Sequence, residues 1–338
     1  MKIRAKITAC TLAFALIITS LMLIVSADTD TLTLAAQYLY SVCLDESDDW
    51  SIFSLARSGL YDISDDVFTQ YLTEISDYID ENADSDGKLS STKSTENSRI
   101  IIAVSALGVD CSTYFNVDIT APLSDFDYVK KQGVNAVAFG LLALDTRGYL
   151  ADSEIREEYI QYLLDCELDA TGWAFSGSVP DPDMTGAVLA ALAPYTDDDE
   201  VAAAVERGIS ALEKLQQDDG TFASWGTVNC ESCAWAVVGL CAVGVNPDTD
   251  ERFIKNGVSA LDAMLSFMLS DGSFSHISGG TTNLMATQQA LYALDAFERF
   301  ESGSSPLFMC VDEDVFELLS RFVTLFKLLI YMLTMIFR

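Results

Sequence analysis

Two acids, a cysteine pair and a histidine are the residues of this chain whose types and spacing could do chemistry. The segment CESC contains Cys230, Glu231 and Cys233, and the segment DPDMT contains Asp183. A carboxylate and a thiolate two residues apart can converge on a zinc ion, and a carboxylic acid that is kept protonated can act as a general acid. His276 is the only histidine of the sequence. These residues raise zinc binding, thiol chemistry and acid catalysis as hypotheses.

The segments that must position these residues follow a repeated pattern. Five short phrases that end in leucine recur along the chain, at 105–107, 142–144, 190–192, 238–240 and 292–294. Each phrase closes a segment that is apolar on every side, which is typical of a completely buried helix. The segments before them are amphipathic, with 64–79, 201–215 and 250–269 as the clearest predicted surface helices.

The spacing of these pairs predicts the fold class. A looser copy of the apolar phrase at 50–57 brings the number of helical pairs to six. Glycine and an aromatic residue stand in the turn between the two helices of several pairs, for instance in DGTF at 219–222. Buried helices that alternate with amphipathic ones suit a closed ring better than an open solenoid. We therefore predict an all-α protein, an α/α toroid of six hairpins.

The repeat phrases resemble those of a known superfamily. The pattern is similar to that of the α/α toroids, which include prenyltransferase β-subunits, squalene and terpene cyclases, and cobalamin carriers. Bacterial exported proteins with prenyltransferase/squalene-oxidase repeats have phrases that resemble those at 50–59, 95–99, 131–135, 181–185 and 283–291. The resemblance covers about residues 31–300. It implies the fold, but not one function, because toroids host unrelated chemistries.

The resemblance to protein prenyltransferases suggests zinc only in part. Those enzymes hold zinc with an Asp-x-Cys motif at the start of one inner helix and a histidine on the next. Glu231-Ser232-Cys233 corresponds to the first motif, but the next inner helix offers Ala286-Thr287-Gln288. His276 precedes that helix and does not match the motif. We predict no metal and no cofactor, with catalytic zinc as the alternative.

Two other enzyme classes of this architecture depend on Asp183. Class II terpene cyclases protonate an alkene with the middle acid of Asp-x-Asp-Asp, and Asp183 corresponds to that acid, whereas Met184 replaces its neighbour. Six-hairpin barrels also host glycan-cleaving enzymes with paired carboxylates, for which Asp183 and Glu231 would be the pair. The simpler interpretation of Asp183 is a first-turn acid that the helix dipole favours. The thioester motif of complement-type toroids is absent from the sequence.

The starts of the inner helices are the predicted binding region. Parallel inner helices would gather their first residues at one rim, with aromatic side chains from the preceding turns as walls. We predict noncatalytic binding of a ligand or partner there, with an isoprenoid-like molecule or a glycan as candidate ligand. Helix capping and packing between repeats compete with this interpretation for each residue. Asp183 and Glu231 are catalytic candidates only if the protein is an enzyme, and the binding candidates are Glu96, Asn97, Asn135, Trp173, Thr185, Trp225, Phe274, Thr287 and Gln288.

The repeat alignment offers a simpler explanation of the cysteine pair. Cys233 occupies the position that Thr185 and Thr287 hold in neighbouring repeats. Packing between repeats would then explain the pair without chemistry. A disulfide or a reactive thiol at a helix N-terminus is an alternative. Loss of Cys10 with a signal peptide would leave seven of the eight cysteines, which argues against a fold that depends on disulfides.

The two ends of the chain indicate export. Residues 1–27 combine a basic start, an uncharged apolar run and small residues before Asp28, which is typical of a signal peptide, with an uncleaved anchor as the alternative. The toroid domain is predicted over 28–302, followed by a linker at 303–314 and an apolar helix at 315–338. That helix is a candidate membrane anchor or a last helix packed on the domain. We expect a secreted or cell-surface, membrane-associated protein.

The charge of the chain limits its partners. The formal net charge is −32 at pH 7. Such a field repels nucleic acid and anionic lipid head groups from the bulk of the surface. We therefore predict no nucleic-acid partner, and the sequence does not identify a protein partner.

Overall fold

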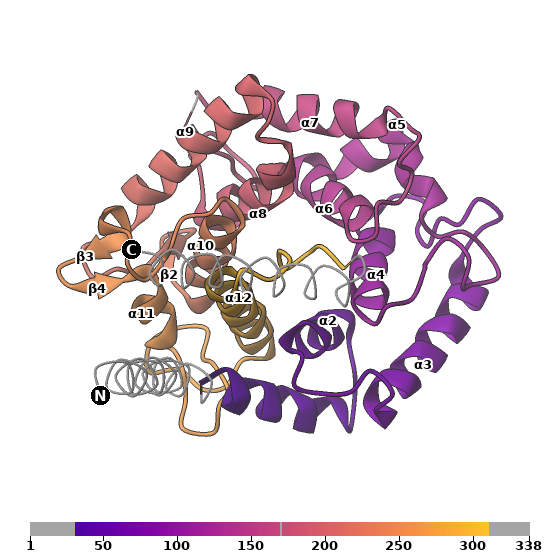
Figure 1. Ribbon diagram of the computed structural model, residues 1–338, viewed down its shortest axis with the longest axis horizontal. Coiled ribbons are helices and arrows are strands. Elements are labelled where there is room, and N and C mark those ends of the chain that lie inside the picture. Colours follow the sequence, from indigo (N-terminus) through magenta and orange to yellow (C-terminus); the bar gives the residue numbers. More distant parts are fainter. Residues whose placement is uncertain (1–30, 170, 311–338) are drawn as a thin grey trace, which may run out of the picture.

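The helices of the computed structural model form two concentric layers (Figure 1). The structure describes residues 31–169 and 171–310. The predicted signal peptide, Cys10 and the apolar segment 315–338 lie outside these residues. Within the described residues, no helix combines the length and the apolar character that a membrane crossing requires.

The inner layer is a ring that closes on itself. Each inner helix packs against the next, and the last packs against the first. Nearly every residue in the middle of these helices is buried, as the lack of a polar face predicts. The inner helices are α2 (Asp49–Ser58), α4 (Thr95–Ala106), α6 (Gly133–Asp145), α8 (Pro182–Leu192), α10 (Cys230–Ala242) and α12 (Leu284–Ser302).

One helix of the outer layer precedes each inner helix. Val201, Ile209 and Leu212 of the outer helix α9 are buried, whereas Glu206 and Lys214 are exposed. The predicted alternation of amphipathic and buried helices over six hairpins is therefore confirmed. The outer layer contains residues 31–43, α3 (Asp66–Asn82), α5 (Phe126–Val129), α7 (Ile155–Asp165), α9 (Asp199–Leu215) and α11 (Ala260–Leu265).

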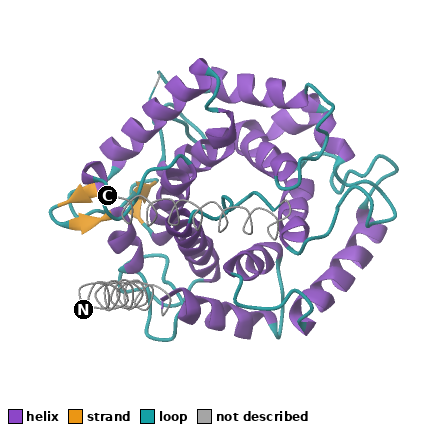
Figure 2. Cartoon of the chain, in the orientation of Figure 1, coloured by secondary structure: helices purple, strands orange, loops and turns teal. Residues whose placement is uncertain are grey.

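The predicted helix at 250–269 is wrong over its first half. The chain forms a short antiparallel hairpin there, with strands β3 (Ile254–Lys255) and β4 (Val258–Ser259), and α11 begins only after it. Asn256 and Gly257 at the tip have φ of 51° and 85°. Asn-Gly is a favoured two-residue hairpin turn, so the local turn overrides the helical spacing of the apolar residues. A second hairpin joins β1 (Ala223–Ser224) to β2 (Thr227–Val228), and Figure 2 shows the strands on one side of the ring.

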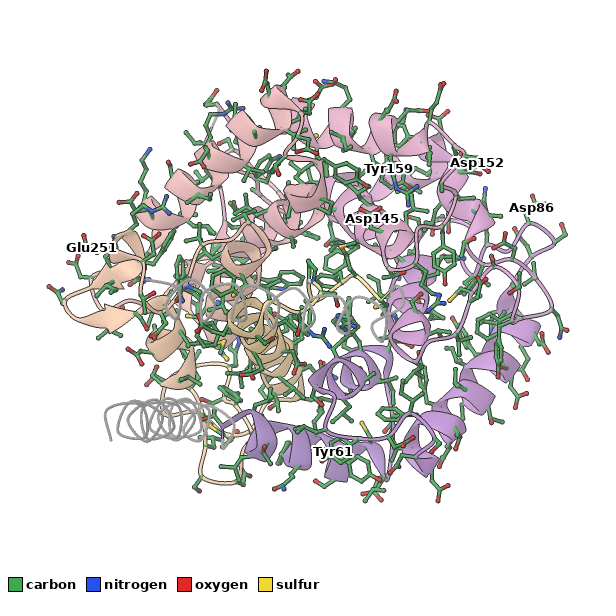
Figure 3. All side chains as sticks on the ribbon, in the orientation of Figure 1. Tyr61, Asp86, Asp145, Asp152, Tyr159 and Glu251 are labelled. Atoms are coloured by element: carbon green, nitrogen blue, oxygen red, sulfur yellow. The ribbon has the colours of Figure 1, made fainter. Side chains whose placement is uncertain are left out.

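Acidic side chains extend from the outer edge of the ring. Asp86, Asp152 and Glu251 are exposed and project outward in Figure 3. Asp145 and Tyr159 lie between the layers in the same view. The Tyr159 hydroxyl donates a hydrogen bond to the Leu123 carbonyl at 2.9 Å. Solvated acids at the edge and paired polar groups inside are consistent with the high cost of burying an unpaired charge.

Residues 303–310 form a strap across the C-terminal ends of the inner helices, visible as the yellow segment after α12 in Figure 1. Arg57 Nη2 donates hydrogen bonds to the carbonyls of Pro306 at 3.0 Å and Met309 at 3.2 Å. The amide of Cys310 donates to the Thr146 carbonyl at 2.7 Å. Phe308 stacks on Phe53, with ring centroids 5.1 Å apart. The strap is therefore anchored across this end of the ring, where it borders a cavity of about 320 Å³.

Helices α8 and α10 approach each other more closely than side chains would allow. A Cβ atom added to Gly186 would lie 2.1 Å from the Trp235 carbonyl oxygen, and one added to Gly239 would lie 2.7 Å from the Gly186 Cα. Both obstacles are backbone atoms, which cannot move aside as a flexible side chain can. Glycine is therefore required on both helices for the two inner helices to pack.

We expect the Gly186→Ala substitution to lower the free energy of unfolding by at least about 2 kcal/mol, because overpacking a fixed backbone contact costs more than the helix propensity of alanine returns. Urea unfolding of the purified protein measures the change. Ser210→Ala, at an exposed position of α9, is the matched control and should change stability little. An unchanged midpoint for Gly186→Ala would show that α8 and α10 pack differently.

Candidate functional site

Two adjoining cavities lie at the N-terminal ends of the inner helices. Their volumes are about 390 Å³ and about 300 Å³. Both are lined by Asn135, Phe139 and Trp235. The first also contacts Glu96 of α4, and the second contacts Asp183 of α8. The starts of the inner helices thus gather at one rim, as predicted, and they border these two cavities.

Four aromatic rings border the first cavity and form a closed cycle. Trp50 contacts Phe139, with ring centroids 5.6 Å apart, and Phe139 contacts Trp235 at 5.5 Å. Tyr292 completes the cycle, 5.5 Å from Trp235 and 6.2 Å from Trp50. Most of these pairs meet edge to face or tilted, which is the preferred geometry of aromatic rings. We name Trp50, Phe139, Trp235 and Tyr292 the aromatic floor.

Asp183 lines the second cavity from the first turn of α8. It accepts a hydrogen bond from Ser232 Oγ at 3.0 Å and another from the Ser224 hydroxyl. The helix cap is a different residue, because Asp181 accepts the Met184 amide at 2.7 Å. Burial raises the pKa of the Asp183 carboxyl above its ordinary value, although the Ser224 hydroxyl acts in the opposite direction. Asp183 therefore holds its proton more strongly than an ordinary aspartic acid does.

Glu231 and His276 form a pair at the same cavity. The Nδ1 atom of His276 lies 2.8 Å and 3.0 Å from the two carboxylate oxygens of Glu231. Glu231 is buried, whereas the His276 side chain is about half exposed. A carboxylate on Nδ1 orients the imidazole and leaves Nε2 as the acceptor of the neutral ring. Sequence reasoning did not include His276 among the site residues; its position just before an inner helix was the available signal.

Cys233 and Glu231 contact different neighbours: Cys233 contacts Phe222, and Glu231 contacts His276. The Cys233 Sγ accepts a hydrogen bond from the Phe222 amide at 3.3 Å, and burial raises the pKa of the thiol to about 12. Within the described residues, no three His, Cys, Asp or Glu side chains lie close enough together to hold a metal ion. The Glu231-Ser232-Cys233 segment thus does not assemble the zinc ligands that its spacing suggests.

The role of Cys233 is shared by other repeats, as the repeat alignment predicts. Thr185 Oγ1 accepts the Trp173 amide at 3.1 Å, and Thr287 Oγ1 accepts the Phe274 amide at 2.9 Å. In each case a side chain of the first helical turn satisfies a backbone amide of the preceding glycine turn. We name this contact the turn lock. It explains Cys233 by packing within its own hairpin, without chemistry.

The structure separates the predicted binding residues into two groups. Glu96, Asn135 and Trp225 line the cavities. Gln288 joins the ends of the ring, because its Nε2 donates to Asp48 Oδ2 at 2.7 Å. The six candidates that are buried in contacts within or between repeats are Asn97, Trp173, Thr185, Phe274, Thr287 and Gln288.

Comparisons with known proteins support the fold. Neither a family model nor a curated protein matches the sequence. A solved structure, Candida albicans protein geranylgeranyltransferase-I complexed with GGPP, is similar with a TM-score of 0.54 and 13% identity. The match covers 83% of this chain and 96% of that chain. The protein therefore has a prenyltransferase-like α/α-toroid fold, and at this identity the likeness carries the fold alone.

We expect Cys233→Thr to preserve stability and Cys233→Val to lower the free energy of unfolding by about 1 to 3 kcal/mol, because valine leaves the buried Phe222 amide without an acceptor. Threonine supplies the acceptor that other repeats use. Urea unfolding of both variants measures the difference. Equal stability of the two variants would show that the turn lock does not stabilise the fold.

We expect the stability of Asp183→Asn relative to the native protein to increase as pH rises from about 3 to about 7. An acid whose folded pKa is raised stabilises the fold below its ordinary pKa, about 3.9, and loses this contribution as pH rises through the raised value. Asparagine cannot ionise and does not incur that loss. Thermal unfolding of the variant and the native protein across this pH range measures the difference in stability. Asp152→Asn, at an exposed position, is the control for net charge.

Proposed function

We propose that this protein is a noncatalytic binding protein that holds a small-molecule ligand at the rim end of its toroid. The observation that carries the proposal is the aromatic floor beneath two adjoining cavities. An apolar part of the ligand would cover the rings of Phe139 and Trp235, which border both cavities. Burial of such surface contributes roughly 25 cal/mol for each Å². The chain ends suggest an exported, surface-attached protein as the setting.

The two ends of the ring differ in a way that supports this choice of site. The strap crosses the end at which the inner helices finish and borders a cavity of about 320 Å³ there. Its Phe308 stacks under Trp235, with centroids 6.4 Å apart. The rim end carries polar side chains around apolar rings, the combination typical of ligand pockets. The structural neighbour was solved complexed with GGPP, so a molecule can bind to a protein of this fold.

Asp183 supports one catalytic alternative. A carboxyl with a raised pKa can donate a proton, and the oriented imidazole of His276 can accept one. The enzyme would then be cyclase-like or glycan-active, with Asp183 as acid. Recovery of a bound molecule in chemically altered form would replace the noncatalytic proposal. The Asp183→Ala and Glu231→Ala variants would in that case bind the molecule and return it unchanged.

The proposed function is tested with the neutral apolar dye N-phenyl-1-naphthylamine and the full chain. We expect saturable fluorescence enhancement with one dye per protein. The Asn135→Trp variant fills space where the two cavities meet and should weaken binding by about tenfold or more, which corresponds to about 1.4 kcal/mol.

Thr73→Trp, at an exposed position of the outer helix α3, adds the same side chain outside the site and should bind the dye as the native protein does. Circular dichroism confirms that both variants are folded. The proposal is wrong if the dye does not bind saturably, or if Asn135→Trp binds it with unchanged affinity.

A further inference from the structure

An exposed apolar surface surrounds one side of the rim. Its residues come from the loops that lead into α8, α10 and α12 and from the first turn of α12. Other large apolar side chains are exposed elsewhere on the described surface, which is normal for soluble proteins. The residues of this surface, which we name the apolar collar, are Phe175, Val179, Trp225, Ile277, Leu284 and Met285.

Trp225 is the most exposed member of the collar. It lies at the tip of the β1–β2 hairpin, is 80% exposed and has a φ of 55°, followed by Gly226 with a φ of 78°. This left-handed conformation is strained for a bulky side chain, and asparagine or glycine is the usual residue there. Packing does not account for the tryptophan, since its ring contacts little of the protein. Strained residues of this kind concentrate at binding sites.

The collar is continuous with the second cavity. Phe175, Trp225 and Met285 are collar residues that also line that cavity, together with Asp183 and Glu231. A ligand in the cavity therefore has apolar surface at two levels, the aromatic floor below and the collar at the mouth. The carboxyl groups of Asp183 and Glu231 line the same cavity, at the starts of α8 and α10.

The charges that line the two cavities favour a cation. Arg99 donates to carboxylates of Asp49 at 2.8 Å and Glu96 at 2.7 Å. His276 is held by Glu231. Among the residues that line the cavities, these two are the side chains able to carry positive charge, and carboxylates already bind both. An anionic head group would find no unpaired cation there.

One buried hydrogen-bond acceptor at the first cavity has no donor among the described residues. Gln289 lines the first cavity beside Trp50 and Tyr292. Its Oε1 is buried and has no hydrogen-bond partner within the described structure. A buried acceptor without a donor is costly, so a ligand that brings an N–H group would relieve this cost. Aromatic faces attract cations as well.

We propose that the rim site recognises an amphiphilic organic ammonium ion. Its apolar chain covers the collar around Trp225, and its ammonium group lies among Asp183, Glu231 and the aromatic floor. This inference rests on the proposed function, because it names the class of ligand for the same site.

The test compares three probes with the same chain length, octylammonium, 1-octanol and octanoate, by calorimetric titration of the full chain. Octylammonium should bind about tenfold tighter than 1-octanol, and octanoate should bind weakest. Raising the salt concentration should lower the affinity for octylammonium and leave the affinity for 1-octanol unchanged, since salt screens charge.

Two variants test the two parts of the site separately, the carboxylate for the ammonium group and the collar for the apolar chain. Glu231→Gln should remove most of the preference for octylammonium over 1-octanol, and Trp225→Ala should weaken both probes several-fold. Tyr114→Ala removes an exposed aromatic residue that lines neither cavity and should bind like the native protein. The salt dependence of the native protein tests the proposal even if Glu231→Gln does not fold.

The possible results distinguish this inference from the proposed function. If 1-octanol binds as tightly as octylammonium, the ligand class is wrong and the apolar binding site stands. If octanoate binds more tightly than octylammonium, the ligand class is likewise wrong and the apolar binding site stands. If N-phenyl-1-naphthylamine and all octyl probes fail to bind, both the proposed function and the inference are wrong.

Discussion

The rim of this toroid depends on one small contact, the turn lock between a first-turn side chain and the backbone of the glycine turn before it. Thr185, Cys233 and Thr287 make this contact in successive repeats. Asn97 makes a related one, because its Oδ1 accepts the Leu89 amide at 3.1 Å. Each contact fixes where an inner helix begins relative to its turn. Asp183 and Glu231 follow the helix starts by one residue, so their positions are determined by the same contact.

The ring also has two unlike ends, and they differ in the side chains that border their cavities. Six parallel inner helices gather their starts at one end and their finishes at the other. The strap covers the finishes and places Phe308 against Phe53 and Trp235. Trp235 also belongs to the aromatic floor, so apolar packing is continuous from the strap to the cavities. Polar side chains remain at the rim, where water and ligand have access.

Much of this architecture was predictable from the sequence. The apolar segments without a polar face predicted the inner ring, and the shared position of Cys233, Thr185 and Thr287 predicted a packing role for the cysteine. The Asn256-Gly257 turn was an available signal for the β3–β4 hairpin, but the helical spacing of nearby apolar residues concealed it. Glycine at 186 and 239 gave no such signal, because its necessity arises from the approach of two helices.

By itself, the sequence determined the helices, their pairing and the strongly acidic surface, because these depend on local periodicity and composition. Tertiary structure alone decided which side chains meet at the rim. Glu231 and His276 are 45 residues apart, and Trp50 and Tyr292 come from the first and last inner helices. Such contacts depend on the curvature of the ring and on its closure between α12 and α2. Curvature is the sum of many packing contacts between helices, and no single segment encodes it.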